Sequence, residues 1–340
     1  MNAPDRAAWL AARRSGVGGS DISAILGINP WRTAVGVWMD KTGRTPDNEI
    51  NEAMFWGTVL EDVVARHYAE TEQRKVQRIG EMMRHPKHEW MLANIDRAIV
   101  TPGSRARFDG GRLLGADGIL ECKTASAYKA GEWGREGDDD AIPTHYAAQA
   151  MWYLAIAGLD WCDVAVLIGG QKYLTKRIER DDETIRGMIE RAEEFWFKHV
   201  VEGIAPEPKT GDDALKLFPQ DSGRIIKANP KTLELIARAQ ELKMQIKALE
   251  EELEGDKKKG TAGVIGSLKA FMGDASAIAI GDDALITWKA AKGSVKTDYA
   301  AAIAKLQEIY KGEETMLTDI GNAISANTTT VAGVRRFLIR

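Results

Sequence analysis

Apolar and polar residues follow two different periods along the first part of the chain. Apolar residues recurring three and four positions apart predict helices at residues 9–14, 22–26, 56–68, 144–158 and 182–201. Short apolar or alternating runs predict strands at residues 91–100, 118–123, 163–169 and 172–179, the last two as a hairpin. Long helices mixed with buried strands are typical of an α/β protein.

The pattern changes after the proline-containing segment at residues 205–209. A heptad seam follows, formed by Leu235, Ala239, Leu242, Ile246, Leu249 and Leu253. This seam is too short for a stable free coiled coil, so we expect a helical hairpin. Beyond it, the pattern predicts a hairpin at residues 277–289, a helix at 299–310 and a last strand at 335–340. We therefore expect a domain at residues 1–208 and an α+β extension at 209–340, with a heptad helix at 231–254 and a small β/α unit at 262–340.

Composition narrows the class of protein. Hydrophobic residues make up 44% of the 340-residue chain and charged residues 28%, as in soluble globular proteins. No apolar stretch approaches the roughly 20 residues of a membrane span, and the N-terminus lacks the form of a signal peptide. Two cysteines are too few for a disulfide framework or a four-cysteine metal site. A cytoplasmic protein without a membrane partner is expected.

Charge is distributed unevenly. The net charge of −4 argues against a protein that coats nucleic acid. Between residues 73 and 112, however, nine Lys and Arg stand against four Asp and Glu. This segment fits either a solvated charged surface or a groove that follows a phosphate backbone.

Two neighbouring predicted strands carry the charged residues with the clearest chemistry. Asp96 lies on one strand, and Glu121 and Lys123 lie on the next, on the same face because side chains alternate along a strand. The apolar run before Glu121 predicts that this strand is buried, where unpaired charges are costly. Crowded carboxylates, to which Glu61 adds a third, require a cation. Their oxygen atoms suit Mg²⁺ or Mn²⁺, and Lys123 could orient or help to deprotonate a water molecule.

The order of these residues along the chain resembles a known family. A helix with Glu61 precedes a strand with Asp96, a strand with Glu121-Cys122-Lys123 and a helix with Gln149 and Tyr153. Further matching pieces are Trp9-Leu10-Ala11-Ala12-Arg13, Gly18-Gly19-Ser20-Asp21 and Ala93-Asn94-Ile95-Asp96. Together they resemble the PD-(D/E)XK nucleases and, among these, the YqaJ-like viral recombinase family that includes lambda exonuclease.

The resemblance implies roles for individual residues. It implies a mixed central sheet flanked by helices, with Glu61, Asp96, Glu121 and Lys123 as catalytic residues. The metal ligands would be Asp96, Glu121 and the backbone carbonyl of Cys122. The residues implied to bind nucleic acid are Arg13, Ser20, Asn94, Gln149 and Tyr153.

The sequence also departs from the family. Ile95 precedes Asp96 where the superfamily name has proline. The link from Asp96 to Glu121 is longer than in lambda exonuclease, so Asp109 and Asp117 compete as the motif aspartate. Asp117 is too near Glu121 in sequence to lie on a facing strand, which favours Asp96. Residues beyond about 210 lie outside the resemblance to lambda exonuclease.

The function implied by the resemblance is a Mg²⁺-dependent exonuclease. It would digest linear double-stranded DNA from 5′ to 3′ and expose single strands for annealing. Its expected partners are DNA ends, a single-strand annealing protein and further copies of itself in a trimer. Two alternatives remain, a non-catalytic scaffold that binds DNA ends and another PD-(D/E)XK endonuclease. The intact set of charged residues favours an enzyme.

Overall fold

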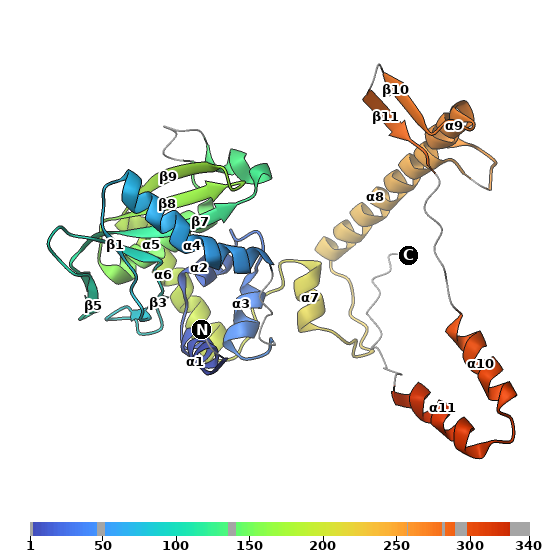
Figure 1. The fold of residues 1–340 in the computed structure, drawn as a ribbon, viewed down its shortest axis with the longest axis horizontal. Coiled ribbons are helices and arrows are strands. Elements are labelled where there is room, and N and C mark those ends of the chain that lie inside the picture. The colour runs from blue at the N-terminus through green and yellow to red at the C-terminus, as the bar shows by residue number, and fades with distance from the viewer. Residues whose placement is uncertain are drawn as a thin grey trace. The chain divides into compact units, whose positions relative to one another are not determined.

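The computed structural model describes residues 3–45, 52–134, 141–256, 258–280, 283–289 and 298–326. It divides into two compact units, the first unit at residues 1–218 and the second unit at residues 219–340 (Figure 1). None of the described helices combines the length and the apolar character that a bilayer crossing requires.

A five-stranded mixed sheet forms the centre of the first unit, with the strands in the order β1-β4-β7-β8-β9. Strands β7 and β8 are parallel, and the other neighbours are antiparallel. The strands of this sheet are β1 (Val76–Gln77), β4 (Arg97–Val100), β7 (Ala116–Ala125), β8 (Trp161–Ile168) and β9 (Lys172–Glu179). Two small hairpins accompany it, β2 (Met83–Arg84) with β3 (Leu92–Ala93) and β5 (Arg107–Asp109) with β6 (Arg112–Leu114).

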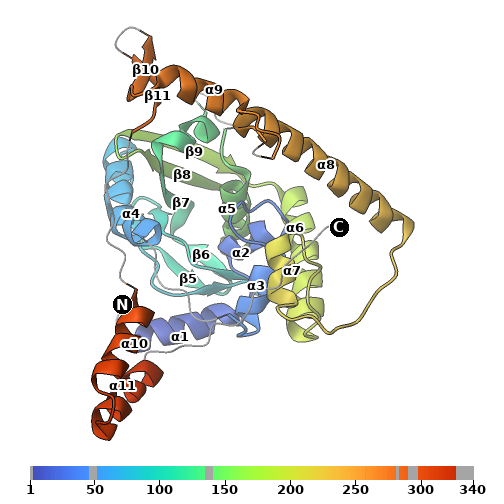
Figure 2. The same cartoon turned by 90° about the vertical axis from the view of Figure 1, so that its right-hand side faces the viewer.

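Helices cover both faces of this sheet, as Figure 2 shows. Helix α4 (Glu52–Thr71) packs through Val64 and Tyr68 against Leu120 on one face. Helix α5 (Thr144–Ala157) and helix α6 (Asp182–Glu194) belong to the larger core on the other face. Side chains alternate between the two faces of the sheet along β7, so Leu120 packs on the α4 side and Ile119 packs in the larger core. The structure confirms the α/β class and the mixed central sheet flanked by helices.

The first unit contains further helices. They are α1 (Ala3–Arg14), α2 (Gly19–Ile25), α3 (Ala34–Lys41), the 3-10 helix η1 (Ala127–Trp133), the π-helical turn η2 (Phe195–Val201) and α7 (Gly211–Leu217). The helix expected at 182–201 is thus α6 continued by η2. Helix α2 begins three residues earlier than expected, with Gly18 at its N-cap, so Ser20 lies inside the helix and Asp21 accepts a hydrogen bond from the Gly18 N–H at 3.0 Å.

The strand expected at 91–100 is interrupted. Residues 94–96 separate β3 from β4, and Asp96 lies in a bend. This break lets the Asp96 carboxylate turn toward β7, where its Oδ2 accepts a hydrogen bond from the Cys122 N–H at 2.8 Å. An uninterrupted ladder would have fixed the side chain perpendicular to the sheet.

The first unit ends at Phe218 and not at residue 208, where the domain boundary was expected. Helix α7 belongs to it because the buried Asp213 accepts a hydrogen bond from Thr33 Oγ1 at 2.6 Å. Leu217 also packs against the main core. The proline-containing segment therefore lies within the unit, and composition alone did not mark its end.

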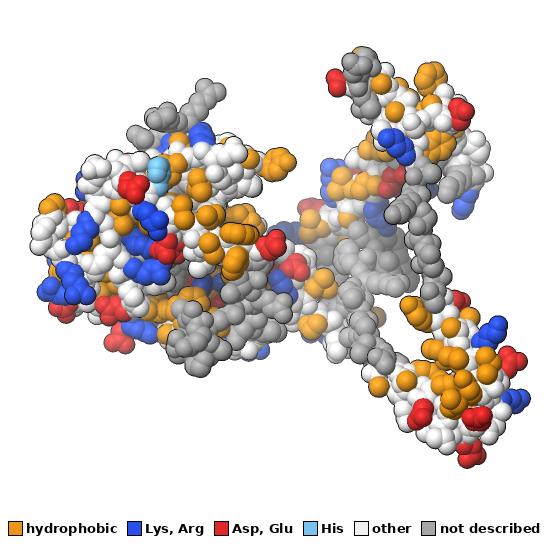
Figure 3. Space-filling model, in the orientation of Figure 1, with side chains coloured by type: hydrophobic (Ala, Val, Ile, Leu, Met, Phe, Trp, Pro, Cys, Tyr) orange, Lys and Arg blue, Asp and Glu red, His pale blue; other side chains and the backbone are white. Residues whose placement is uncertain are grey.

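The second unit contains the long helix α8 (Pro230–Glu254), which spans the expected heptad helix and is capped by Asn229. Helix α9 (Gly263–Met272) packs on it. The hairpin of β10 (Ala277–Ile280) and β11 (Asp283–Thr287) follows, and then α10 (Tyr299–Ile309) and α11 (Glu314–Ala326). None of the residues of α8 is buried, and all of its seam residues except the partly buried Ala239 are exposed within the described part. Figure 3 shows hydrophobic side chains at the surface of both units. The strand expected at 335–340 lies outside the described residues.

Candidate active site

The bend before β4 and the middle of β7 bring Asp96 and Glu121 together. Besides the bond from Cys122, the Asp96 N–H lies 3.4 Å from Glu121 Oε1. Strand pairing sets this register, with Arg97 opposite Leu120. Neither alternative aspartate is placed in this way. Asp109 lies exposed in the β5–β6 hairpin, and Asp117 accepts a hydrogen bond from Thr101 Oγ1 at 2.6 Å.

Glu121 is buried, with 1% of its surface exposed, on the face of β7 that α5 covers. Its Oε2 atom accepts hydrogen bonds from Lys123 Nζ at 2.9 Å and from Gln149 Nε2 at 3.1 Å. Gln149 Nε2 also lies 3.0 Å from Tyr153 Oη. The structure therefore joins four of the expected residues, Glu121, Lys123, Gln149 and Tyr153, into one hydrogen-bonded group.

Burial and like charge raise the pKa of both carboxyl groups. Burial, followed by the charge of Asp96, raises the pKa of Glu121 to about 7. Burial also raises the pKa of Asp96 above its ordinary value. For Lys123, burial lowers the pKa, but the charges on Glu121 and Asp96 outweigh it and raise the pKa above its usual value. Lys123 is therefore a cation at neutral pH, which fits a hydrogen-bond donor better than the proton acceptor also considered from the sequence.

Glu61 does not join the carboxylate pair. Its Oε1 atom lies 2.5 Å from Arg97 Nη1 and 3.1 Å from Arg78 Nη2. The Arg97 guanidinium also contacts Asp62 and the Asp96 carbonyl, and the charge of Glu61 is among the causes that raise the pKa of Asp96. Arg97 was not recognised from the sequence. A single arginine inside a predicted buried strand is the signal that could have identified it, because such a charge needs carboxylate partners.

The donor set fits a divalent cation that retains several water molecules. Within the described ranges, no cluster of three or more His, Cys, Asp or Glu side chains could hold a metal ion. Asp96 and Glu121 supply two carboxylates, and Mg²⁺ is commonly held by one or two carboxylates together with water and substrate phosphate. The pKa values of both acids are raised, and a bound cation would lower them by stabilising the two carboxylates.

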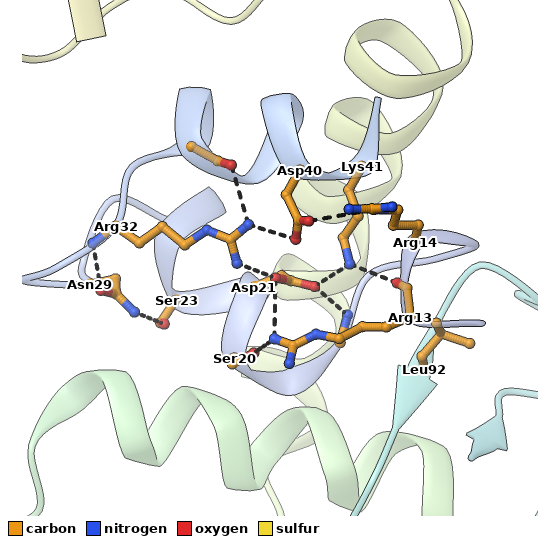
Figure 4. Close-up of polar contacts among 12 residues, drawn as sticks. Arg13, Arg14, Ser20, Asp21, Ser23, Asn29, Arg32, Asp40, Lys41 and Leu92 are labelled. Carbon is orange, nitrogen blue, oxygen red and sulfur yellow. Dashed lines mark hydrogen bonds and ion pairs between the residues drawn. The ribbon is translucent and has the colours of Figure 1, made fainter. Parts of the chain in front are cut away.

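The glycine-rich turn places Arg13 and Ser20 near this group. A Cβ atom at Gly19 would lie 2.4 Å from the Tyr153 ring and 3.0 Å from Gln149, so only glycine lets α2 approach α5 this closely. Arg13 Nη2 donates to Ser20 Oγ at 2.5 Å. Figure 4 shows both residues in a polar cluster with Asp21, Arg32 and Lys41.

Asn94 is the expected nucleic-acid-binding residue with the least support. It is exposed in the link between β3 and β4, and none of the described hydrogen bonds joins it to Asp96 or Glu121. Sequence reasoning also missed Asp21 as more than a helix cap. The sequence holds no signal for this role, because Arg32 and Lys41 reach Asp21 only when the segment 32–41 packs on α2.

Two sequence comparisons identify the family. A model of the YqaJ-like viral recombinase domain matches residues 8–160. The uncharacterized protein YqaJ of Bacillus subtilis (strain 168) is 38% identical over 280 residues, which cover 77% of this chain and 81% of that protein. The chain belongs to the YqaJ-like viral recombinase family. The matched domain model spans Arg13, Asp96, Glu121 and Gln149, so the hydrogen-bonded group lies within the part that defines the family.

Solved structures are similar to part of this YqaJ-like chain. An alkaline exonuclease from Laribacter hongkongensis has 22% sequence identity and a TM-score of 0.43, covering 57% of this chain and 92% of that chain. A phage-related exonuclease from Haemophilus somnus 129PT has 14% identity and a TM-score of 0.40, covering 56% and 96%.

Proposed function

We propose that this YqaJ-like protein is a Mg²⁺-dependent exonuclease that digests linear double-stranded DNA from 5′ to 3′. The observation that carries the proposal is the pairing of Asp96 and Glu121 beside Lys123 in a buried site. A scaffold protein would gain nothing from two crowded carboxylates, since burial raises the pKa of each and their charges repel.

The residues of the site divide the chemistry between them. Asp96, Glu121 and the carbonyl of Cys122 would hold the cation, which when bound acidifies water and stabilises negative charge on phosphate. Lys123 donates hydrogen bonds from its ammonium group and would orient the attacking water or the phosphate oxygen. Gln149 holds the Glu121 carboxylate in place at 3.1 Å. Glu61 acts through Arg97, which it fixes against the Asp96 carbonyl.

Arg13, Ser20 and Gln149 would bind the terminal 5′ phosphate of the strand being digested. Arg13 and Ser20 contact each other, and Gly19 lies against Gln149, which connects this cluster to the carboxylates. A guanidinium and a hydroxyl group are suitable donors to phosphate. End recognition next to the cleavage centre would give the 5′-to-3′ polarity.

The proposal also includes a protein partner and an oligomeric assembly. The exposed single strand would pass to an annealing protein in the cytoplasm. A trimeric ring that encloses the duplex would explain how a chain with a net charge of −4 remains on DNA. Light scattering at micromolar concentration tests the assembly, and a monomer would contradict it.

Digestion of linear duplexes that carry a label at either the 5′ or the 3′ end tests the function. We expect early release of the 5′ label in Mg²⁺ or Mn²⁺ and no release in EDTA. A circular duplex is the matched control and should stay intact. Binding of ends without digestion would favour a scaffold, and cutting of the circle would favour an endonuclease.

A further inference from the structure

A buried charge cluster lies beneath Arg13 and Ser20 (Figure 4). The Asp21 side chain is fully buried, and its Oδ2 atom lies 2.7 Å from Lys41 Nζ, which is also fully buried. Its Oδ1 atom accepts a hydrogen bond from Arg32 Nη1 at 2.9 Å. Burial raises the pKa of Asp21, but the charges of Lys41, Arg13 and Arg32 outweigh it and hold the pKa well below its usual range. Asp21 is therefore a carboxylate shared by several cations.

This cluster fixes both ends of the turn that leads from α1 to α2. At the α1 end, Lys41 Nζ donates to the Arg13 carbonyl at 2.8 Å. At the α2 end, Asp21 Oδ2 accepts from the Gly18 N–H at 3.0 Å. The Arg13 guanidinium lies 3.9 Å from Asp21 Oδ1 and donates to Ser20. Backbone and side chain of Arg13 are thus both tied to the same ion pair.

The cluster gathers several cations around two carboxylates. Its cations are Arg13, Arg14, Arg32 and Lys41, and its carboxylates are Asp21 and Asp40. A phosphate monoester at pH 7 carries between about −1.5 and −2, so cations gathered around Arg13 favour a phosphorylated end over a hydroxyl end.

A purely structural role explains the arrangement less well. Replacing a buried ion pair by apolar side chains of similar volume is often neutral or stabilising, because both charges must be taken out of water. Two contacts of this ion pair are instead directed at Arg13, one at its carbonyl and one at its guanidinium. The geometry favours orientation over stability as the reason for the pair.

We propose that Asp21, Lys41 and Arg32 are positioning residues that hold Arg13 and Ser20 for a terminal phosphate monoester on DNA. The inference rests on the proposed function, since it specifies how that enzyme would distinguish a phosphorylated end. None of the three residues has to touch DNA. They act by fixing the Arg13 guanidinium and by setting the charge around it.

The test compares the binding of short duplexes that differ only in a 5′ phosphate or a 5′ hydroxyl. Fluorescence anisotropy in EDTA reports binding independently of cleavage. The double variant Asp21→Asn/Lys41→Met removes both buried charges while keeping the side-chain volumes. We expect the parent to bind the phosphorylated end about 10- to 100-fold more tightly, as the loss of a charge-assisted hydrogen bond would predict, and the double variant to bind both ends equally.

Asp163→Asn is the matched control. Asp163 is also buried and paired, with Arg177 Nε at 2.7 Å and Tyr68 Oη at 2.6 Å, but it does not contact the Arg13 cluster. It should cost stability without changing the preference for phosphate. If the double variant does not fold, Arg32→Gln removes a partly exposed partner of Asp21 and should reduce the preference.

Two results would overturn the inference. One is a folded double variant, or a folded Arg32→Gln variant, that keeps the preference of the parent. The other is a parent protein that binds both ends equally while still digesting DNA. That second result would leave the proposed nuclease activity standing, whereas a parent that digests no linear DNA at all would remove the proposed function itself.

Discussion

Asp96 and Glu121 reach each other through backbone as well as side-chain atoms. The Asp96 carboxylate accepts a hydrogen bond from the Cys122 N–H at 2.8 Å, and the Glu121 carboxylate lies 3.4 Å from the Asp96 nitrogen. These contacts hold the acids in place without neutralising them. A small change of charge at either position should therefore act on chemistry more than on folding.

Asp96→Asn and Glu121→Gln should each lower DNA digestion by several orders of magnitude, because each removes a carboxylate that would bind the cation. The rate of digestion in Mg²⁺, with circular dichroism to verify folding, is the measurement. Asp117→Asn is the control and should digest DNA at the rate of the parent. Parent-like digestion by Asp96→Asn would move the site to Asp109 or Asp117.

The raised pKa of Glu121 predicts how the stability of the metal-free protein depends on pH. The usual value is 4.5 and the folded-state value is about 7, so between them the folded protein binds a proton that the unfolded chain has released. The free energy of unfolding should fall as pH rises through this window, by about 1.4 kcal/mol per pH unit at most.

Denaturant unfolding in EDTA between pH 4.5 and 8 measures this dependence. The difference in free energy of unfolding between the parent and Glu121→Gln isolates the contribution of Glu121. Parallel curves for the two proteins would show that the pKa of Glu121 is not raised. Added Mg²⁺ should reverse the loss at pH 8, because the cation replaces the proton.

At the scale of elements, the approach of α2 to α5 places the Arg13 cluster next to the carboxylates. Gly19 permits it, since any side chain at this position would overlap the Tyr153 ring. A backbone hydrogen bond also fixes the turn before α2, because the Val17 N–H donates to the Trp90 carbonyl at 2.6 Å. The position of α2 is therefore determined from both sides.

Gly19→Ala should lower stability by about 1–3 kcal/mol, because the added methyl group overpacks the contact with Tyr153. It should also weaken the preference for phosphorylated ends. Gly57→Ala is the matched control. Gly57 lies in helix α4, and a Cβ atom at this position would meet only Thr124 Oγ1, at 4.0 Å. That change should raise stability by about 0.5–1 kcal/mol. Thermal unfolding of both variants measures the difference, and equal effects would contradict the assigned packing.

At the scale of the whole molecule, the first unit includes a helix beyond the proline-containing segment. Helix α7 returns to the core through Asp213, which accepts hydrogen bonds from Thr33 Oγ1 and from the Lys209 N–H at 3.0 Å. Leu217 adds an apolar contact. The place at which the chain is cut should therefore matter more than the length that is removed.

A truncation at residue 218 should keep the stability of the first unit, and a truncation at residue 208 should lose about 1–3 kcal/mol. The shorter chain lacks α7 and leaves Thr33 without its partner. Asp213→Ala in the longer truncation serves as the control and should reproduce part of the loss. Identical unfolding midpoints for the two truncations would show that α7 contributes nothing to the unit.

The sequence by itself determined the elements and the chemistry of the strand motif. Helix α5, strands β8 and β9 and the face shared by Glu121 and Lys123 follow from local periodicity, because side-chain spacing is a property of the helix and the strand alone. The family resemblance added Arg13, Ser20, Gln149 and Tyr153. The structure bonds Gln149 to both Glu121 and Tyr153, and it places Gly19, next to Ser20, against Gln149. Their roles in binding and catalysis remain predictions.

Only the tertiary structure decided which charged residues meet. Glu61 pairs with Arg97, and Asp21 pairs with Lys41. The local pattern can mark Arg97 as a charge in a buried strand, but it does not show which acid Arg97 meets, and it does not distinguish Asp21 or Lys41 from solvated charges. The bend that frees Asp96 from its strand and the return of α7 to the core were likewise unpredictable. Periodicity describes neighbours along the chain, whereas the partners of a buried charge come from distant segments and depend on how helices and strands pack.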